Sequence, residues 1–196
     1  FQLLISEIAM SVQQIKRNRR LFREAEGFLE LATLFDDQHP LEVDRKQDLA
    51  KRCLDTLAQI QDAGIRKFRV FYLKGQALRL AENYPKAIEA LEQAFTLDDS
   101  NIHTCLALAW CYKRSGQMEM AVDAMQRALT LDPESGIAHY NMACYLALQK
   151  NPRASLIHLA KAIEIDTRYR ELAQAESDFD LIRDDPEFRA KTAAAI

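Results

Sequence analysis

The central part of the chain repeats itself with a period of about 34 residues, and this period limits the fold more than any other feature. Small residues recur at three matched places, namely Gly75, Ala109 and Ala143; Ala87, Ala121 and Ser155; and Ala94, Ala128 and Ala162. Larger apolar residues keep the same step, as in Leu91, Met125 and Leu159, and in Leu97, Leu131 and Ile165. This pattern is typical of helix–turn–helix units stacked into a solenoid. Solenoids present surfaces and seldom catalyse reactions, so the period favours binding.

The composition agrees with an all-helical protein. The 196 residues include only five Gly and five Pro, and 48% are apolar. A net charge of −3 argues against bulk electrostatic binding to nucleic acid. No run of residues approaches the length and apolar content of a membrane span. The sequence begins with Phe1 rather than Met, so we expect a fragment of a longer chain.

The four cysteines show neither CxxC spacing nor zinc-ligand intervals to histidine. They are Cys53, Cys105, Cys111 and Cys144, and each falls where a helix would place an apolar residue. We therefore expect buried free thiols, no metal site and a reducing, cytoplasmic location.

Residues 1–66 are predicted to form a helical hairpin ahead of the regular repeats. A first helix over 1–35 carries an apolar stripe at alternating spacings of four and three, namely Phe1, Ile5, Ile8, Val12 and Ile15. The apolar face then changes phase, because Phe22, Ala25, Leu29 and Ala32 point a third of a turn or more away. A loop from Asp36 to about Pro40 leads to a second helix over 44–61. Its expected buried residues are Leu49, Cys53, Leu54, Leu57 and Ile60.

A basic cluster lies between the two apolar stretches of the first helix. Lys16, Arg19, Arg20 and Arg23 share one helix face. A solvated face is the favoured interpretation, since no aromatic interleaving or second basic stretch accompanies it. A nucleic-acid or anionic-membrane patch is the alternative.

Regular helix pairs are predicted at 67–81 and 84–97, at 101–115 and 118–131, and at 135–149 and 152–165. They form three units over 67–167, with approximate limits 68–101, 102–135 and 136–169. Residues 168–196 are predicted to cap the array. Phe179, Leu181, Ile182 and Phe188 would pack on the last unit, and Asp185 with Pro186 would begin a final helix.

These residues resemble the tetratricopeptide repeat. The family pattern requires a small residue at the eighth position of each unit, which Gly75, Ala109 and Ala143 supply. It requires Tyr or an apolar residue three positions later, matched by Leu78, Tyr112 and Leu146. The early Trp of the family is replaced by Phe71, Cys105 and His139, and its late Pro occurs only at Pro133. The resemblance implies an all-α superhelix with an N-terminal helical pair and C-terminal capping helices, and the closing segment is similar to that of many bacterial members.

In this family the first helix of each unit lines a concave groove, so its outward residues are the candidate binding site. The first unit offers Arg69, Tyr72, Gln76, Arg79 and Leu80. The second offers His103, Leu106, Trp110, Lys113 and Arg114. The third offers Ile137, Tyr140, Asn141, Cys144 and Leu148. The aromatic and cationic members predict a peptide or protein partner with apolar and acidic residues. The alternative is that Trp110 packs internally and the protein itself partly fills the groove.

Motifs for phosphate loops, hydrolases, metalloproteases and calcium loops are absent, so we predict neither an enzyme nor a cofactor. Cys105 and His139 occupy equivalent positions, which invites a nucleophile–base pair, but core packing is favoured because nothing marks a third group or a cleft. A two-carboxylate clamp for chaperone tails is disfavoured. Its positions hold Tyr72, Gln76, Ala107, Ile137 and Asn141, and only Asn141 is of the right kind.

The sequence thus predicts an interaction module, a scaffold or adaptor, in a bacterial cytoplasm. Two alternatives stay open. One is a homodimer formed through the N-terminal apolar stripe, and the other is a repeat-type chaperone that shields an apolar partner segment.

Overall fold

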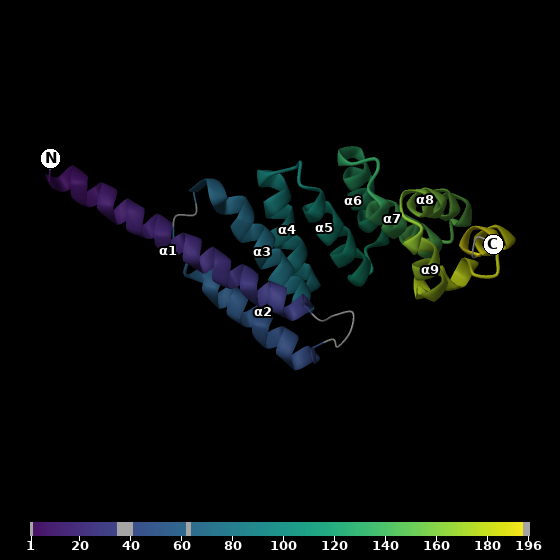
Figure 1. The fold of residues 1–196 in the computed structure, drawn as a ribbon, viewed down its shortest axis with the longest axis horizontal. Coiled ribbons are helices and arrows are strands. Elements are labelled where there is room, and N and C mark those ends of the chain that lie inside the picture. Colours follow the sequence, from purple (N-terminus) through teal and green to yellow (C-terminus); the bar gives the residue numbers. More distant parts are fainter. Residues whose placement is uncertain (1, 35–40, 62–63, 194–196) are drawn as a thin grey trace. The chain divides into compact units, whose positions relative to one another are not determined.

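The computed structural model describes residues 2–34, 41–61 and 64–193, with side chains from Val12 onward except that of Ile65. The described residues form helices joined by short turns, and no strand occurs among them (Figure 1). The predicted loop from Asp36 to Pro40 lies outside the described residues. The chain divides into two compact units, Phe1–Asp99 and Ser100–Ile196, which are described separately below.

The first unit contains the N-terminal hairpin and the first regular repeat. Its helices are α1 (Gln2–Thr33), α2 (Val43–Ala58), α3 (Lys67–Leu80) and α4 (Tyr84–Leu97), with a 3-10 turn η1 (Gly64–Arg66) before α3. The helix α2 therefore ends three residues before the predicted limit. α1 packs on α2, α2 on α3 and α3 on α4, as in a stack of helix pairs.

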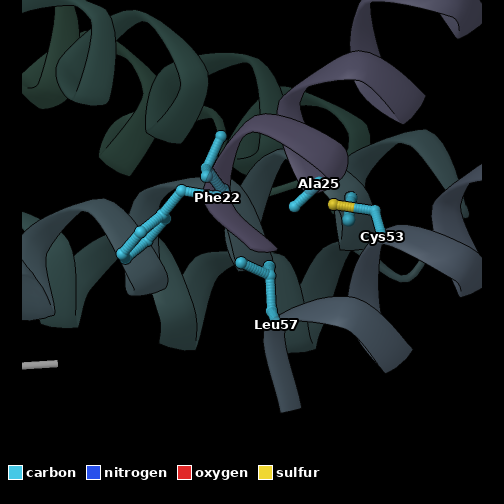
Figure 2. Close-up of a cluster of buried hydrophobic side chains, with 6 residues drawn as sticks. Phe22, Ala25, Cys53 and Leu57 are labelled. Atoms are coloured by element: carbon cyan, nitrogen blue, oxygen red, sulfur yellow. The ribbon is translucent and has the colours of Figure 1, made fainter. Parts of the chain in front are cut away.

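A continuous apolar cluster joins the hairpin to the repeat in this unit. Figure 2 shows Phe22 and Ala25 of α1 in this cluster, together with Cys53 and Leu57 of α2. Leu73 and Ala77 of α3 complete the cluster. Leu49, Leu54 and Ile60, which were predicted to be buried, are only half-buried. The change of apolar phase along α1 thus marks the point where the helix begins to pack on its neighbours.

The second unit contains two repeats and the C-terminal segments. Its helices are α5 (Ile102–Arg114), α6 (Met118–Leu131), α7 (Gly136–Leu148), α8 (Pro152–Ile165), α9 (Arg168–Ala175) and α10 (Pro186–Thr192), with a 3-10 helix η2 (Ser177–Ile182) between the last two. The helix limits agree with the sequence prediction to within one residue in α5–α8. The prediction of an all-α repeat fold is confirmed.

The periodic small residues lie where the two helices of a repeat cross. At Gly75 an added Cβ would come within 2.5 Å of Leu91 Cγ, so a larger residue at this crossing would require Leu91 to move. Ala87 and Ala121 are fully buried, and so is Ser155 in the corresponding place. The Ser155 hydroxyl donates a 2.8 Å hydrogen bond to the Ala143 carbonyl. That bond explains why a polar residue is tolerated in this apolar position.

The turns inside the repeats obey the same period. Glu82, Gly116 and Lys150 occupy equivalent positions in successive repeats and have φ values of 57°, 73° and 60°. Only the middle repeat places glycine in this left-handed conformation, which costs other residues energy. Asn83 and Asn151 then cap α4 and α8, each accepting a hydrogen bond from the backbone N–H three residues later.

The tail closes the second unit largely as predicted. Phe179, Ile182 and Phe188 are buried, and Asp185 caps α10 with Pro186 in its first turn. Leu181 was predicted to pack inward, and this is wrong, because it is 62% exposed. The reason is that η2 is a 3-10 helix, in which residues three apart share a face. Phe179 and Ile182 occupy the inner face, and Leu181 points outward.

Candidate functional site

The first unit has a hollow between α1 and α3 that receives four of the predicted groove residues. Tyr72, Gln76, Arg79 and Leu80 line it from α3, and all four are half-buried. The opposite wall comes from α1, with Glu26, Leu29, Glu30 and Thr33, and Leu73 lies at the base. The hollow has a volume of about 320 Å³. Its lining combines an apolar floor with cationic, amide and carboxylate groups.

Arg69, the fifth predicted residue of α3, is held by α1. Its Nε lies 2.8 Å from Glu26 Oε1, and its guanidinium carbon lies 4.9 Å from the centroid of the Phe22 ring. Farther along α3, Arg79 Nε donates to Gln76 Oε1 at 3.0 Å. Arg69 therefore serves to fix α3 against α1, and Arg79 is the cation that lines the hollow.

In the second unit the expected groove is covered by the tail. Tyr140 is only 8% exposed and Cys144 only 2%. Both are therefore buried, whereas the sequence predicts them at the surface of the groove. The Tyr140 ring stacks on Tyr169 at a centroid distance of 4.9 Å and meets the edge of Phe179 at 5.9 Å. Lys113, predicted to attract a partner, instead forms an ion pair with Asp178 of η2 and lies 5.7 Å from the Tyr145 ring centroid. In this unit the protein's own tail therefore fills part of the groove, which is the alternative that the sequence left open.

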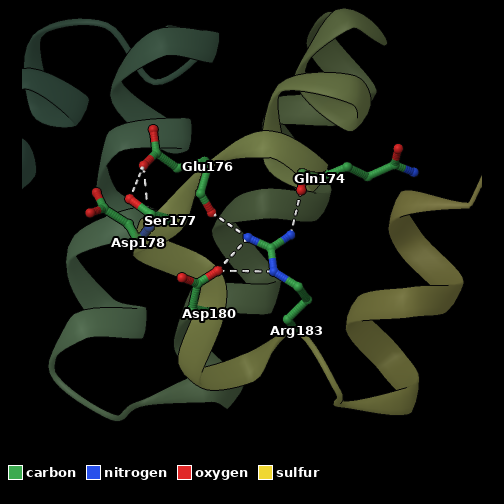
Figure 3. Close-up of polar contacts among 6 residues, drawn as sticks. All are labelled: Gln174, Glu176, Ser177, Asp178, Asp180 and Arg183. Atoms are coloured by element: carbon green, nitrogen blue, oxygen red, sulfur yellow. Dashed lines mark hydrogen bonds and ion pairs between the residues drawn. The ribbon is translucent and has the colours of Figure 1, made fainter.

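The covering segment is cross-linked internally by the guanidinium of Arg183. Figure 3 shows Arg183 bonded to the carbonyls of Gln174 and Glu176 and to the carboxylate of Asp180. Glu176 in turn caps η2 by accepting from the Asp178 N–H. The Tyr169 ring, at the start of this segment, lies against Gly136, where an added Cβ would come within 2.9 Å of it. The contact of Tyr169 with Gly136 ties the tail to α7, whereas the bonds of Arg183 and Glu176 lie within the tail.

The remaining candidates lie at or near the surface of the second unit. His103, Arg114 and Ile137 are exposed, and Leu106, Trp110, Asn141 and Leu148 are half-buried. The Arg114 guanidinium carbon lies 5.6 Å from the Trp110 ring centroid. Trp110 is thus partly covered from its own helix.

The cysteines and histidines form packing contacts rather than a reactive pair. All four cysteines are free and buried, as predicted. Burial, with a smaller contribution from Glu26, raises the pKa of the Cys53 thiol to about 12, and burial also raises the pKa of Cys144. His139 is not placed as a base for the Cys105 thiol. Its Nδ1 lies 2.9 Å from His158 Nδ1, and its Nε2 lies 3.0 Å from the Pro133 carbonyl oxygen.

The described part of the chain also lacks two features. No group of three or more metal-binding side chains occurs there. No described helix is long and apolar enough to cross a bilayer.

With this geometry established, comparison with known proteins identifies the repeat. The family model of the tetratricopeptide repeat matches residues 78–143. Residues 78–143 are tetratricopeptide repeat sequence. No curated protein matches it in sequence.

Solved tetratricopeptide repeat structures share its fold. YrrB, described as a tetratricopeptide repeat protein with an unusual peptide-binding site, is 21% identical with a TM-score of 0.59, over 87% of this chain and 90% of that one. MamA from Desulfovibrio magneticus RS-1 is 18% identical with a TM-score of 0.57, over 80% of this chain and 94% of that one. At these identities the likeness concerns the fold. The fold supports a protein-interaction module.

The α1 wall of the hollow was not predicted from the sequence. Glu26, Glu30 and Thr33 lie beside the apolar face of α1, but the sequence predicts the hairpin only as a degenerate repeat or cap and places no binding residue on it. A signal was present in α2, because Cys53 and Leu57 lie one full period before Ala87 and Leu91. All four of these side chains are buried, so α2 packs through the same two positions as α4.

Proposed function

We propose that the protein is an adaptor that binds a segment of another protein, and that the hollow between α1 and α3 is the anchoring site. The main support is the lining of this hollow by Tyr72, Leu80 and Arg79 opposite Glu26 and Glu30. An apolar side chain of the partner would rest on Tyr72 and Leu80. Arg79 would bind a neighbouring carboxylate of the partner, since guanidinium groups form strong charge-assisted hydrogen bonds.

The second unit contributes less in this proposal. Tyr140, Cys144 and Lys113 are engaged by the chain's own tail, so they cannot contact a partner while the tail is in place. Trp110 and Ile137 remain as secondary contacts. In this proposal fewer residues contact the partner than the sequence alone predicts, and the apolar side chain of the partner binds in the first unit.

A bacterial cytoplasm is the proposed setting. Four unpaired cysteines suit a reducing compartment. The closing segment around Asp185 and Pro186 resembles that of bacterial tetratricopeptide repeat proteins.

The test is selection of binding peptides from a random display library with the full chain as bait, followed by fluorescence anisotropy of the selected peptides. We expect Tyr72→Ala to weaken these peptides at least tenfold, because truncating an aromatic anchor at the centre of an interface typically costs about 2 kcal/mol or more. Leu80→Arg serves as a second groove variant. Lys74→Ala, an exposed change on the same helix, is the matched control and should leave affinity unchanged.

Circular dichroism shows whether each variant retains its helices. The proposal fails if the selected peptides bind the folded Tyr72→Ala and Leu80→Arg proteins as tightly as the parent. It also fails if only Trp110→Ala weakens them.

A further inference from the structure

The helix α1 has a second face that its own fold does not use. Successive residues turn by about 100° in an α-helix. The face formed by Asn18, Phe22 and Ala25 is buried. A second face, with Val12, Ile15 and the cations of the basic cluster, is centred a little over a third of a turn away. Figure 1 shows that this N-terminal half of α1 extends past the end of α2.

A single contact marks where the hairpin packing stops. The Asn18 amide donates a 2.7 Å hydrogen bond to the Gln61 carbonyl, just beyond the end of α2. Asn18 is only 7% exposed, whereas Val12 and Ile15 on the other face are 43% and 46% exposed. The core face of α1 is therefore buried within the first unit, whereas the second face is exposed.

The cations of this region stand apart from the ion pairs that the described residues form. Lys16, Arg17, Arg19, Arg20 and Arg23 are all exposed, and among the residues that the structure describes none of them forms an ion pair. With Gln13 and Gln14, four of them line a shallow hollow of about 740 Å³. Five cations within eight residues stand out in a chain whose net charge is −3. Such a cluster attracts a polyanionic surface.

We propose that this face of α1 docks on an anionic phospholipid surface. Lys16, Arg19, Arg20 and Arg23 bind the lipid phosphates, and Val12 and Ile15 enter the boundary between headgroups and acyl chains. By sequence spacing the apolar stripe extends back to Ile8, Ile5 and Phe1. An apolar stripe joined to a cluster of four to eight cations is the pattern of helices that bind acidic lipids.

The exposed apolar residues favour a lipid surface over nucleic acid. A single strand of nucleic acid would be bound by exposed aromatic rings between the cations, and the aromatic residue in that stretch, Phe22, is only 1% exposed. The same cations disfavour parallel pairing of two copies, because like charges would face each other. The proposal does not depend on the peptide-binding function, which uses residues from Glu26 onward.

The test is co-sedimentation of the full chain with vesicles of phosphatidylcholine, with or without phosphatidylglycerol. We expect binding to the anionic vesicles only, decreasing as salt is added. The variant Arg19→Gln/Arg20→Gln/Arg23→Gln should lower the partition coefficient on the order of a hundredfold, since each cation near an anionic membrane contributes roughly a fivefold factor. The control Lys74→Gln/Lys86→Gln/Arg153→Gln removes the same charge from exposed positions elsewhere and should bind as the parent does.

A second variant, Val12→Ser/Ile15→Ser, separates a lipid surface from other polyanions. It should weaken vesicle binding several-fold while leaving any binding of single-stranded RNA unchanged. Equal binding to neutral and anionic vesicles overturns the proposal, as does an equal effect of the two triple variants. Absence of vesicle binding also overturns it, whether the arginines then prove to bind RNA or light scattering detects a dimer that Val12→Ser/Ile15→Ser dissociates.

Discussion

Lys113 of α5 forms an ion pair with Asp178 of η2, which lies 65 residues later in the chain. The two side chains are only 25% and 11% exposed, so solvent screens the pair weakly. This contact fastens the tail over the inner helices of the second unit. The tail is thereby a structural part of the array rather than an appendage.

We expect Asp178→Asn to destabilise the second unit by about 2 kcal/mol, because the largely buried Lys113 ammonium loses its counter-charge. Urea unfolding monitored by circular dichroism measures the change. Asp184→Asn is the control, since that carboxylate is 96% exposed in its pair with Arg189 and should contribute almost nothing. Equal stability of the two variants would contradict the role assigned to Asp178.

Loosening the tail should uncover a cysteine. Phe179 is fully buried between Tyr140 and Phe188, and Cys144 lies beneath the same segment. We expect Phe179→Ala to speed alkylation of Cys144 by iodoacetamide at least tenfold at pH 8, as measured by mass spectrometry of the labelled peptides. Cys53 in the first unit is the internal control, and Leu181→Ala, at an exposed position, should leave the rate unchanged. An unchanged Cys144 rate in folded Phe179→Ala would show that the tail does not shield it.

The helix crossing at Gly75 should reject even a methyl group. Gly75→Ala brings a Cβ to 2.5 Å from Leu91 Cγ, and we expect a loss of about 1–3 kcal/mol in unfolding free energy. Gly27→Ala is the matched change in the same unit, where nothing lies within 4 Å of the added Cβ. Because alanine favours helix over glycine, this control should gain up to about 1 kcal/mol. Chemical denaturation of both variants decides whether the effects have opposite signs.

The periodic left-handed turns predict a second pair of opposite effects. Gly116→Ala places a side chain at φ 73°, and should cost about 1 kcal/mol. Lys150→Gly relieves the corresponding strain at φ 60° one repeat later, and should stabilise the protein by about 0.5 kcal/mol after the entropy cost of glycine. Thermal unfolding of the two proteins measures both shifts. A stabilising Gly116→Ala would refute this account of the turn.

The facing histidines predict a loss of stability in mild acid. Burial, with a smaller contribution from His139, lowers the pKa of His158 below 6.5. His139 Nε2–H donates to the Pro133 carbonyl, so its Nδ1 accepts from His158 Nδ1–H when both rings are neutral. The unfolded chain then binds the proton more readily, and the stabilisation present above pH 6.5 is lost as the pH falls.

Urea unfolding from pH 7.5 to 5 measures this dependence. We expect His158→Gln to reduce the slope in that range, whereas His103→Gln, at an exposed position, should keep the parental slope. The same slope in both variants would show that His158 does not contribute.

The repeat fold could be predicted because its constraints are local and periodic. Gly75, Ala109 and Ala143 are small because helices cross there, and each repeat states the constraint again. The hairpin follows this period less closely because α1 is 32 residues long, more than twice the length of α3, so the period is lost ahead of α2. Within α2 the period is still visible, because Cys53, Leu54 and Leu57 lie 34 residues before Ala87, Ile88 and Leu91.

The site could be predicted only in part, for a different physical reason. Tyr72 and Tyr140 both lie on the first helix of a repeat, α3 and α7. Helix periodicity predicts equally well for both which face of the helix carries the side chain. Whether that face lies at a surface depends on segments distant in sequence. Tyr140 is covered by Tyr169 and Phe179, and no periodic pattern carries that contact. The 3-10 form of η2, which turns Leu181 outward, likewise follows from packing on α7 rather than from local sequence.

The seating of Tyr169 against Gly136 also limits how such a chain can lengthen. Repeat arrays gain units by duplication. A unit inserted between α8 and α9 would separate Tyr169 from Gly136, where the lack of a side chain leaves room for the tyrosine ring. New units can enter ahead of α7 without disturbing the pair. We therefore expect additional repeats to be tolerated ahead of α7 but not between α8 and α9.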